Sequence, residues 1–170
     1  SAPLALTNSA GGAIFDVPQG IAYTLGATLN HDAALGASPD GGLVKLGAGT
    51  LVVTNAQAYT GPTALSNGTL SVVAPAGAAL ATGDLVLGRA EGPEVGLMLT
   101  ADRARLTSDG GLAVNGNLFL GQTAVTLIVR ETGMVPSTNG VYVVATCTGA
   151  VSGSAGNLRL ANPIFGKVYT

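Results

Sequence analysis

The sequence predicts an all-β protein, built as a right-handed parallel β-helix (a β-solenoid) and forming a single domain over residues 1–170. Three observations predict it. The composition combines 47% hydrophobic residues with only 9% charged ones and 26 glycines. Short apolar segments alternate with turn residues and show almost no helical periodicity. A small motif of the form Gly-polar-Leu recurs along the chain, as repeat architectures require.

The composition excludes several classes of protein. Disordered chains have low hydrophobicity and high charge, which is the reverse of this chain. Gly, Pro, Asn and Asp interrupt every apolar run before it reaches the ~18–20 residues of a membrane-spanning helix. The seven Lys and Arg residues are scattered, so the sequence lacks the basic patch that a nucleic-acid-binding protein needs. We therefore expect neither membrane insertion nor nucleic-acid binding.

The strand candidates are short and are separated by turn clusters such as Pro39-Asp40-Gly41-Gly42 and Ser66-Asn67-Gly68. Residues 43–53 alternate without a clearly polar face, which is typical of parallel strands packed on both sides. At roughly 20–25 residues per coil, we expect about seven to eight coils. The other expected strands are residues 21–29, 68–73, 84–87, 96–100, 112–114, 118–120, 124–129, 140–148 and 158–160.

The repeated motif gives the stacking its order. Gly49-Thr50-Leu51 returns as Gly68-Thr69-Leu70, and Gly83-Asp84-Leu85 and Gly116-Asn117-Leu118 are weaker copies. Gly41-Gly42-Leu43 is echoed by Gly110-Gly111-Leu112. Because neighbouring coils bury each other's apolar faces, we expect the motif's leucines to share one interior stack; these are Leu51, Leu70 and Leu85.

One segment resembles a known family. Residues 41–72 contain Lys45, then Gly47-Ala48-Gly49-Thr50-Leu51, then Tyr59-Thr60-Gly61-Pro62-Thr63, and finally Asn67-Gly68-Thr69-Leu70. This order is similar to the autotransporter-associated β-strand repeat, the passenger-associated repeat of secreted bacterial β-helices, although Gln57-Ala58 stands where Asn commonly precedes the Tyr. The expected C-terminal coils, about 124–170, also resemble the ends of such proteins. The resemblance implies a right-handed β-helix that is secreted to the cell surface or the extracellular space, without implying a specific activity.

Residues able to support chemistry are few, and we expect no catalytic, cofactor-binding or metal site. Glu91 and Glu94 form the one close carboxylate pair, which we interpret as a solvated turn. His31, the single histidine, lies in a turn-like Asn-His-Asp and is expected to be structural, and Cys147 is expected to be a buried thiol. Asn67-Gly68-Thr69 is a formal glycosylation sequon that coincides with a turn. The densest charged stretch, interpreted as an exposed edge or loop, contains Asp102, Arg103, Arg105 and Asp109.

These observations favour a non-catalytic structural protein that associates with copies of itself, head to tail, into a filament or surface assembly. Residues 1–40 contain three Asp and no Lys or Arg, and residues 132–170 contain Arg159 and Lys167 but no acid, so opposite ends would attract each other. The start at Ser1-Ala2-Pro3 suits a chain from which a signal peptide was removed. The alternatives are a passenger fragment acting as adhesin or spacer and, third, a polysaccharide-active β-helix enzyme.

Overall fold

The computed structural model describes residues 6–74, 80–102, 106, 112–132 and 143–161. Within these ranges it contains strands and two short 3-10 helices, η1 (Ala33–Leu35) and η2 (Ala155–Asn157), but no α-helix. The strands are β1 (Leu6–Asn8), β2 (Ala13–Asp16), β3 (Ala22–Leu25), β4 (Leu29–His31), β5 (Leu43–Leu46), β6 (Thr50–Val53), β7 (Thr63–Leu65), β8 (Gly68–Ala74), β9 (Leu80–Thr82), β10 (Leu85–Leu87), β11 (Val95–Asp102), β12 (Leu112–Val114), β13 (Leu118–Leu120), β14 (Val125–Thr132), β15 (Thr146–Cys147), β16 (Val151–Ser152) and β17 (Leu158–Leu160).

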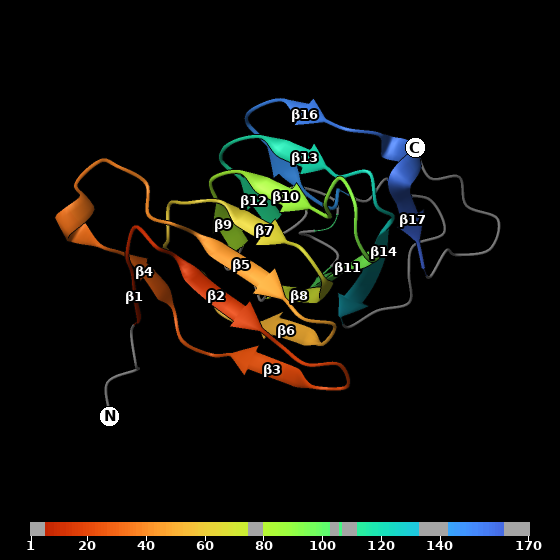
Figure 1. The fold of residues 1–170 in the computed structure, drawn as a ribbon, viewed down its shortest axis with the longest axis horizontal. Helices are drawn as coiled ribbons and strands as arrows, with labels where there is room; N and C mark the ends of the chain where they lie inside the picture. Colours follow the sequence, from red (N-terminus) through yellow and green to blue (C-terminus); the bar gives the residue numbers. More distant parts are fainter. Residues whose placement is uncertain (1–5, 75–79, 103–105, 107–111, 133–142, 162–170) are drawn as a thin grey trace.

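The strands stack into a parallel β-solenoid (Figure 1). The first sheet has the order β2-β5-β7-β10-β13-β16 and the second has the order β3-β6-β8-β11-β14-β17. Two shorter ladders, β1-β4 and β9-β12-β15, complete the coils. All described strand pairs are parallel. The predicted all-β parallel solenoid is therefore confirmed, and right-handedness stays a prediction.

The coils differ in length, and this changes their number. Along the first sheet, 20 residues separate Leu43 from its neighbour Thr63, whereas 33 separate Leu85 from Leu118. The longer coils carry a strand of the β9-β12-β15 ladder, such as β12. The two main sheets consequently have six strands each, and the expectation of seven to eight coils of uniform length was wrong.

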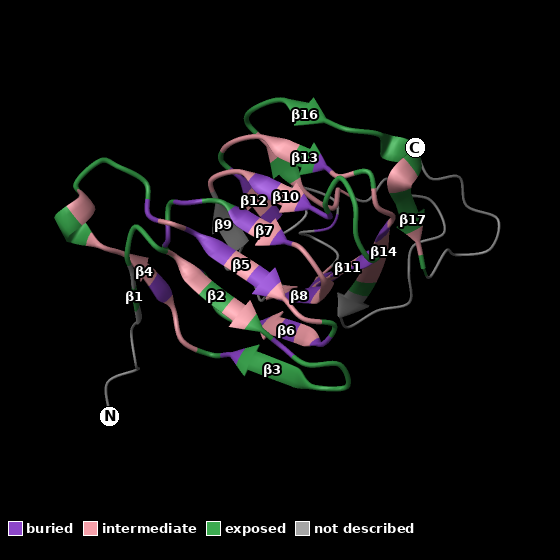
Figure 2. Ribbon diagram, in the orientation of Figure 1, coloured by how far each residue is buried: buried purple, intermediate pink, exposed green. Residues whose placement is uncertain are grey.

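The interior is a set of apolar ladders that run along the solenoid axis. Leu51 pairs with Leu70, and Leu70 pairs with Leu97, and all three are buried. Figure 2 shows that burial is greatest in the middle coils and decreases toward β2, β3 and β16. The expected stack of Leu51 and Leu70 is thus confirmed, because each leucine covers the one in the coil beneath it.

Leu85 does not belong to this stack. It lies on β10 in the first sheet, between Thr63 and Leu118, although it is buried in the same core. The motif Gly-polar-Leu precedes strands of both sheets, because both corners need a small residue followed by an inward apolar one. Sequence similarity therefore merged two structurally different corners, and the true equivalent of Leu70 in the next coil is Leu97.

A row of glycines explains one of these corners. A glycine stands two residues before the first-sheet ladder position of every coil, and the row consists of Gly11, Gly41, Gly61, Gly83, Gly116 and Gly149. A Cβ on Gly61 would lie 2.2 Å from the carbonyl oxygen of Asp40, and one on Gly149 would lie 2.6 Å from that of Gly116. The coils can stack at normal strand spacing here because these positions carry no side chain.

Three expectations from the sequence need correction or fall outside the description. Residues 21–29, expected as one strand, form β3 and β4 with a break at Gly26. Leu112 pairs with Leu80 in a different sheet from Leu43, so its resemblance to the segment at Leu43 was misleading; the neighbouring Gly110 and Gly111 lie outside the described residues. The expected strand 140–148 is described from residue 143 on and contains only β15.

Candidate functional site

The most highly connected polar side chain of the described residues is Asp40, which is only 4% exposed. Its Oδ1 accepts hydrogen bonds from the backbone N–H groups of Gly42 (2.9 Å) and Gly61 (3.0 Å), and its Oδ2 accepts one from the N–H of Thr60 (2.9 Å). Gly42 enters β5 and Gly61 enters β7, so the carboxylate links two successive coils. Burial alone would raise the pKa of Asp40, but the bonds from Thr60, Gly42, His31 and Gly61 outweigh it and lower the pKa below 3.8.

His31 lies against this carboxylate. Its Nδ1 is 3.1 Å from Oδ2 of Asp40 and 3.0 Å from Oγ1 of Thr60, while its Nε2 is 3.1 Å from the carbonyl oxygen of Gly36. A catalytic relay needs the hydroxyl and the carboxylate on opposite ring nitrogens. Here both contact Nδ1 and a backbone carbonyl occupies Nε2. The group fastens the segment 32–42 to the coils and has no relay geometry.

Lys45 is a second buried charge. It is 0% exposed and stands in the interior ladder between Phe15 and Leu65. Its Nζ donates to the carbonyl oxygens of Leu46 (2.5 Å), Gly47 (2.7 Å) and Asn67 (3.2 Å). Burial lowers the pKa of Lys45 below 10.5, and the negative charge of Asp16 opposes that shift. The ammonium thereby joins the β5–β6 corner to the β7–β8 corner.

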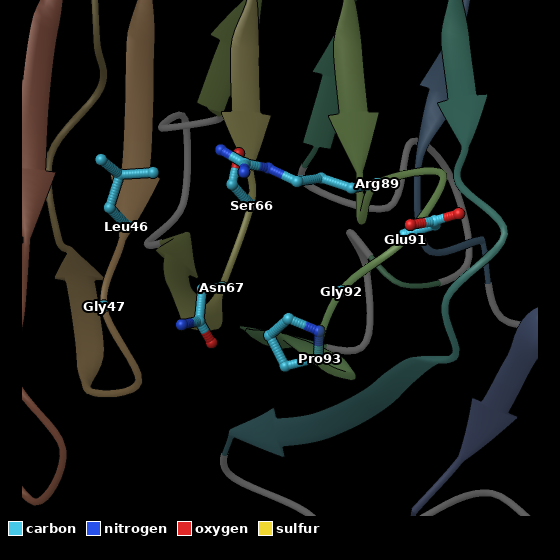
Figure 3. Close-up of a pocket in the computed structure, with 8 residues that line it drawn as sticks. All are labelled: Leu46, Gly47, Ser66, Asn67, Arg89, Glu91, Gly92 and Pro93. Atoms are coloured by element: carbon cyan, nitrogen blue, oxygen red, sulfur yellow. The ribbon is translucent and has the colours of Figure 1, made fainter.

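A small surface hollow lies over these same two corners (Figure 3). Its volume is about 170 Å³. Two residues, Ser66 and Asn67, connect β7 to β8, whereas residues 88–94 connect β10 to β11 and form one wall. The hollow is lined by Leu46, Gly47, Ser66, Asn67, Arg89, Glu91, Gly92 and Pro93.

The remaining candidate residues are not brought together. Glu91 and Glu94 are both exposed, as expected for a solvated turn, and only Glu91 lines the hollow. Glu94 accepts a hydrogen bond from Oγ1 of Thr126. Asp102 ends β11. Three members of the charged stretch, Arg103, Arg105 and Asp109, lie outside the described residues.

Two expectations about single residues have clear outcomes. Cys147, expected to be buried, is half-buried with Sγ 3.0 Å from the carbonyl oxygen of Gly116; the edge position of β15 in its ladder explains the exposure. Asn67 of the sequon lies in the corner turn as expected, and its carbonyl binds Lys45. The part of the chain that the structure describes holds no group of three His, Cys, Asp or Glu suited to a metal ion, and no helix long and apolar enough to cross a membrane.

Sequence reasoning included Lys45 in the repeat motif but missed its burial. The signal was present, because Lys45 has the same parity in its strand as the inward Leu43. The role of Asp40 had no comparable signal, since its partners Thr60 and Gly61 lie 20 and 21 residues away in the next coil.

The fold and these corners define a class: the chain is a parallel β-solenoid whose coils are joined at their corners by buried polar groups. Comparison with protein families makes this more specific. Residues 43–72 match the passenger-associated-transport-repeat family, so the chain carries one such repeat, and it spans β5 to β8 and includes Lys45. Repeats of this family occur in autotransporter passengers. No curated protein and no solved structure matched the chain.

Proposed function

We propose that the chain is a non-catalytic, secreted passenger segment that serves as a spacer or adhesive scaffold at the bacterial cell surface. The observation that carries this proposal is the passenger-associated repeat at residues 43–72 inside a continuous parallel solenoid. Stacked coils give an elongated body whose length grows with coil number. Such a body projects whatever it carries away from its attachment point.

The polar groups support a structural role over a catalytic one. The Asp40 carboxylate is saturated by backbone donors from two coils, and His31 contacts a carbonyl at the nitrogen that a relay would need free. General acid–base catalysis requires a positioned pair facing a substrate space. Among the described residues, the hollow presents a single carboxylate, that of Glu91.

Immunolabelling of intact cells that naturally make the protein tests the location. Surface labelling that external protease removes supports the proposal, and labelling that appears only after permeabilisation contradicts it. For the absence of catalysis, the purified chain is incubated with neutral and acidic polysaccharides. Cleavage that is lost in Glu91→Gln and kept in Glu94→Gln would establish an enzyme instead.

A second candidate function is head-to-tail self-association, and the described ends of the solenoid favour it. Tyr23 on β3 occupies an interior ladder position but is 49% exposed, because no described strand covers it. At the opposite end, Val151 and Leu158 occupy interior positions and are 63% and 40% exposed. Apolar positions that neighbouring coils bury elsewhere are therefore open at both ends.

The two ends are also complementary in register. Continuing the ladders from the last coil onto the first coil of a second copy places Leu160 on Tyr23 and Val151 on Ala13. It also places Gly153 opposite Phe15, the largest side chain of its ladder. The expected charge contrast between the ends is weaker than the sequence indicated, because the charge of Asp40 is buried in hydrogen bonds. Strand pairing and apolar burial would therefore supply the affinity.

Analytical ultracentrifugation tests this second candidate. We expect concentration-dependent oligomers that Val151→Glu abolishes, because the substitution places a charge in the interior of the joint. Ile14→Glu is the matched control, since Ile14 is equally exposed (64%) but alternates with the inward Ala13 and Phe15. A wild-type monomer at high micromolar concentration would exclude self-association and leave the passenger proposal intact.

A further inference from the structure

The hollow at the β5–β6 corner exists because one connection is longer than its neighbours. Three successive coils contribute to it: Leu46 and Gly47, then Ser66 and Asn67, then residues 89–93. The third connection departs from the compact corner beneath it and leaves an open space of about 170 Å³. Figure 3 shows side chains of all three coils around this space.

Polar side chains converge on the hollow without using one another. No hydrogen bond or ion pair within the described part of the chain engages the side chains of Ser66, Asn67, Arg89 or Glu91, whereas most other corner side chains such as Asp40 and Asn117 are bonded. Arg89 extends back along the solenoid toward Ser66 (Figure 3). Its backbone is held by Thr123 and Gln122 of the next coil, so the guanidinium starts from a fixed point.

A buried cation lies behind the floor of the hollow. The three carbonyl groups that bind the Lys45 ammonium belong to Leu46, Gly47 and Asn67, which all line the hollow. The acceptors of this floor are therefore already used, and the positive charge of Lys45 adds to that of Arg89. The two carboxylates nearby are Asp16, beside Lys45, and Glu91, on the Arg89 side of the hollow.

These groups define a ligand chemistry. A guanidinium pairs best with a carboxylate, through two parallel hydrogen bonds. Glu91 accepts hydroxyl protons, and Ser66 and Asn67 both donate and accept. Leu46 and Pro93 provide small apolar contacts. The space is smaller than the ~300–1,000 Å³ of a drug-sized pocket, so it suits a single ring.

We propose that the hollow binds one ring of an acidic saccharide, with the sugar carboxylate on Arg89 and ring hydroxyls on Glu91, Ser66 and Asn67. At about 0.3 kcal/mol per non-hydrogen atom, a uronic acid of about thirteen such atoms binds with a Kd of about 1 mM. Several such rings on a polymer would bind more tightly through multivalency. The inference does not depend on the passenger proposal.

Titration of the ¹⁵N-labelled chain with D-glucuronate to about 20 mM, followed by NMR, tests this inference. We expect saturable shifts at Asn67, Arg89 and Gly92, absent with D-glucose and with acetate at equal ionic strength. Arg89→Gln should weaken binding at least about tenfold, and Arg159→Gln on β17 is the matched control that leaves it unchanged. No shift at these residues, equal shifts with acetate, or full binding by Arg89→Gln would overturn the proposal.

Discussion

Replacing Asp40 by Asn tests whether the buried carboxylate holds two coils together. Asn keeps Oδ1, which accepts from Gly42 and Gly61, but turns Oδ2 into an amide that faces the N–H of Thr60 and the ring of His31. Hydrogen bonds to a charged group contribute about 1.5–3 kcal/mol each, and a buried unpaired donor costs about 1–3 kcal/mol. We therefore expect the free energy of unfolding to fall by about 2–4 kcal/mol at pH 7.

The same carboxylate predicts a pH dependence. The pKa of Asp40 is lowered below 3.8 in the folded chain, so the unfolded chain binds this proton more readily. Its contribution to stability is thus complete above about pH 4–5 and is lost as the pH falls through the folded pKa. Asp40→Asn cannot titrate, so the difference between variant and wild type should shrink toward pH 3.

Urea unfolding followed by far-UV circular dichroism at pH 7 and pH 3 measures both effects. Asp32→Asn is the matched control, because Asp32 is exposed and caps η1 through a single bond to the N–H of Ala34. Asn caps helices as well as Asp does, so we expect a change within about 0.5 kcal/mol. If Asp40→Asn matches the wild type at pH 7, or its deficit is the same at pH 3, the reasoning about this carboxylate is wrong.

Three further predictions concern the ladders and corners. Leu70→Ala should cost about 3–5 kcal/mol in urea unfolding, and Leu160→Ala, at the same ladder position in the open last coil, clearly less; equal losses would contradict the stacking. Gly61→Ala should destabilise the chain strongly, whereas Gly26→Ala, with no atom within 4 Å of the added Cβ, should be tolerated by thermal unfolding. Because burial lowers the pKa of Lys45, it should make wild-type stability rise relative to Lys45→Met between pH 8 and pH 10; parallel profiles would exclude this.

The parallel solenoid was predictable because its signals are local. Residues 43–53 alternate without a polar face, and Leu51 and Leu70 recur at the spacing of one coil. What misled the analysis was also local: Leu85 follows a glycine and a polar residue just as Leu51 does, yet it enters the other sheet. A short motif identifies an inward leucine at a corner, but coil length decides which corner it is.

The corner sites were beyond reach because they depend on which residues neighbouring coils place side by side. Asn67 meets the ammonium of Lys45 only because the coil between them has 20 residues along the first sheet. Arg89 reaches the same corner because an extended connection replaces a two-residue turn. Neither alignment is encoded in a residue pattern at one position.

The most direct test of the central claim, a single continuous stack of parallel coils, is a distance measured along one ladder. Ala22 and Arg159 are exposed, and their ladder passes through Thr50, Thr69, Gly96 and Thr126. Spin labels on cysteines at these two positions, in a Cys147→Ser background, are measured by pulsed electron paramagnetic resonance. Five strand spacings of ~4.8 Å predict a narrow distribution centred at about 24 Å. A broad distribution, or a maximum displaced by more than about two strand spacings, would contradict the continuous stack.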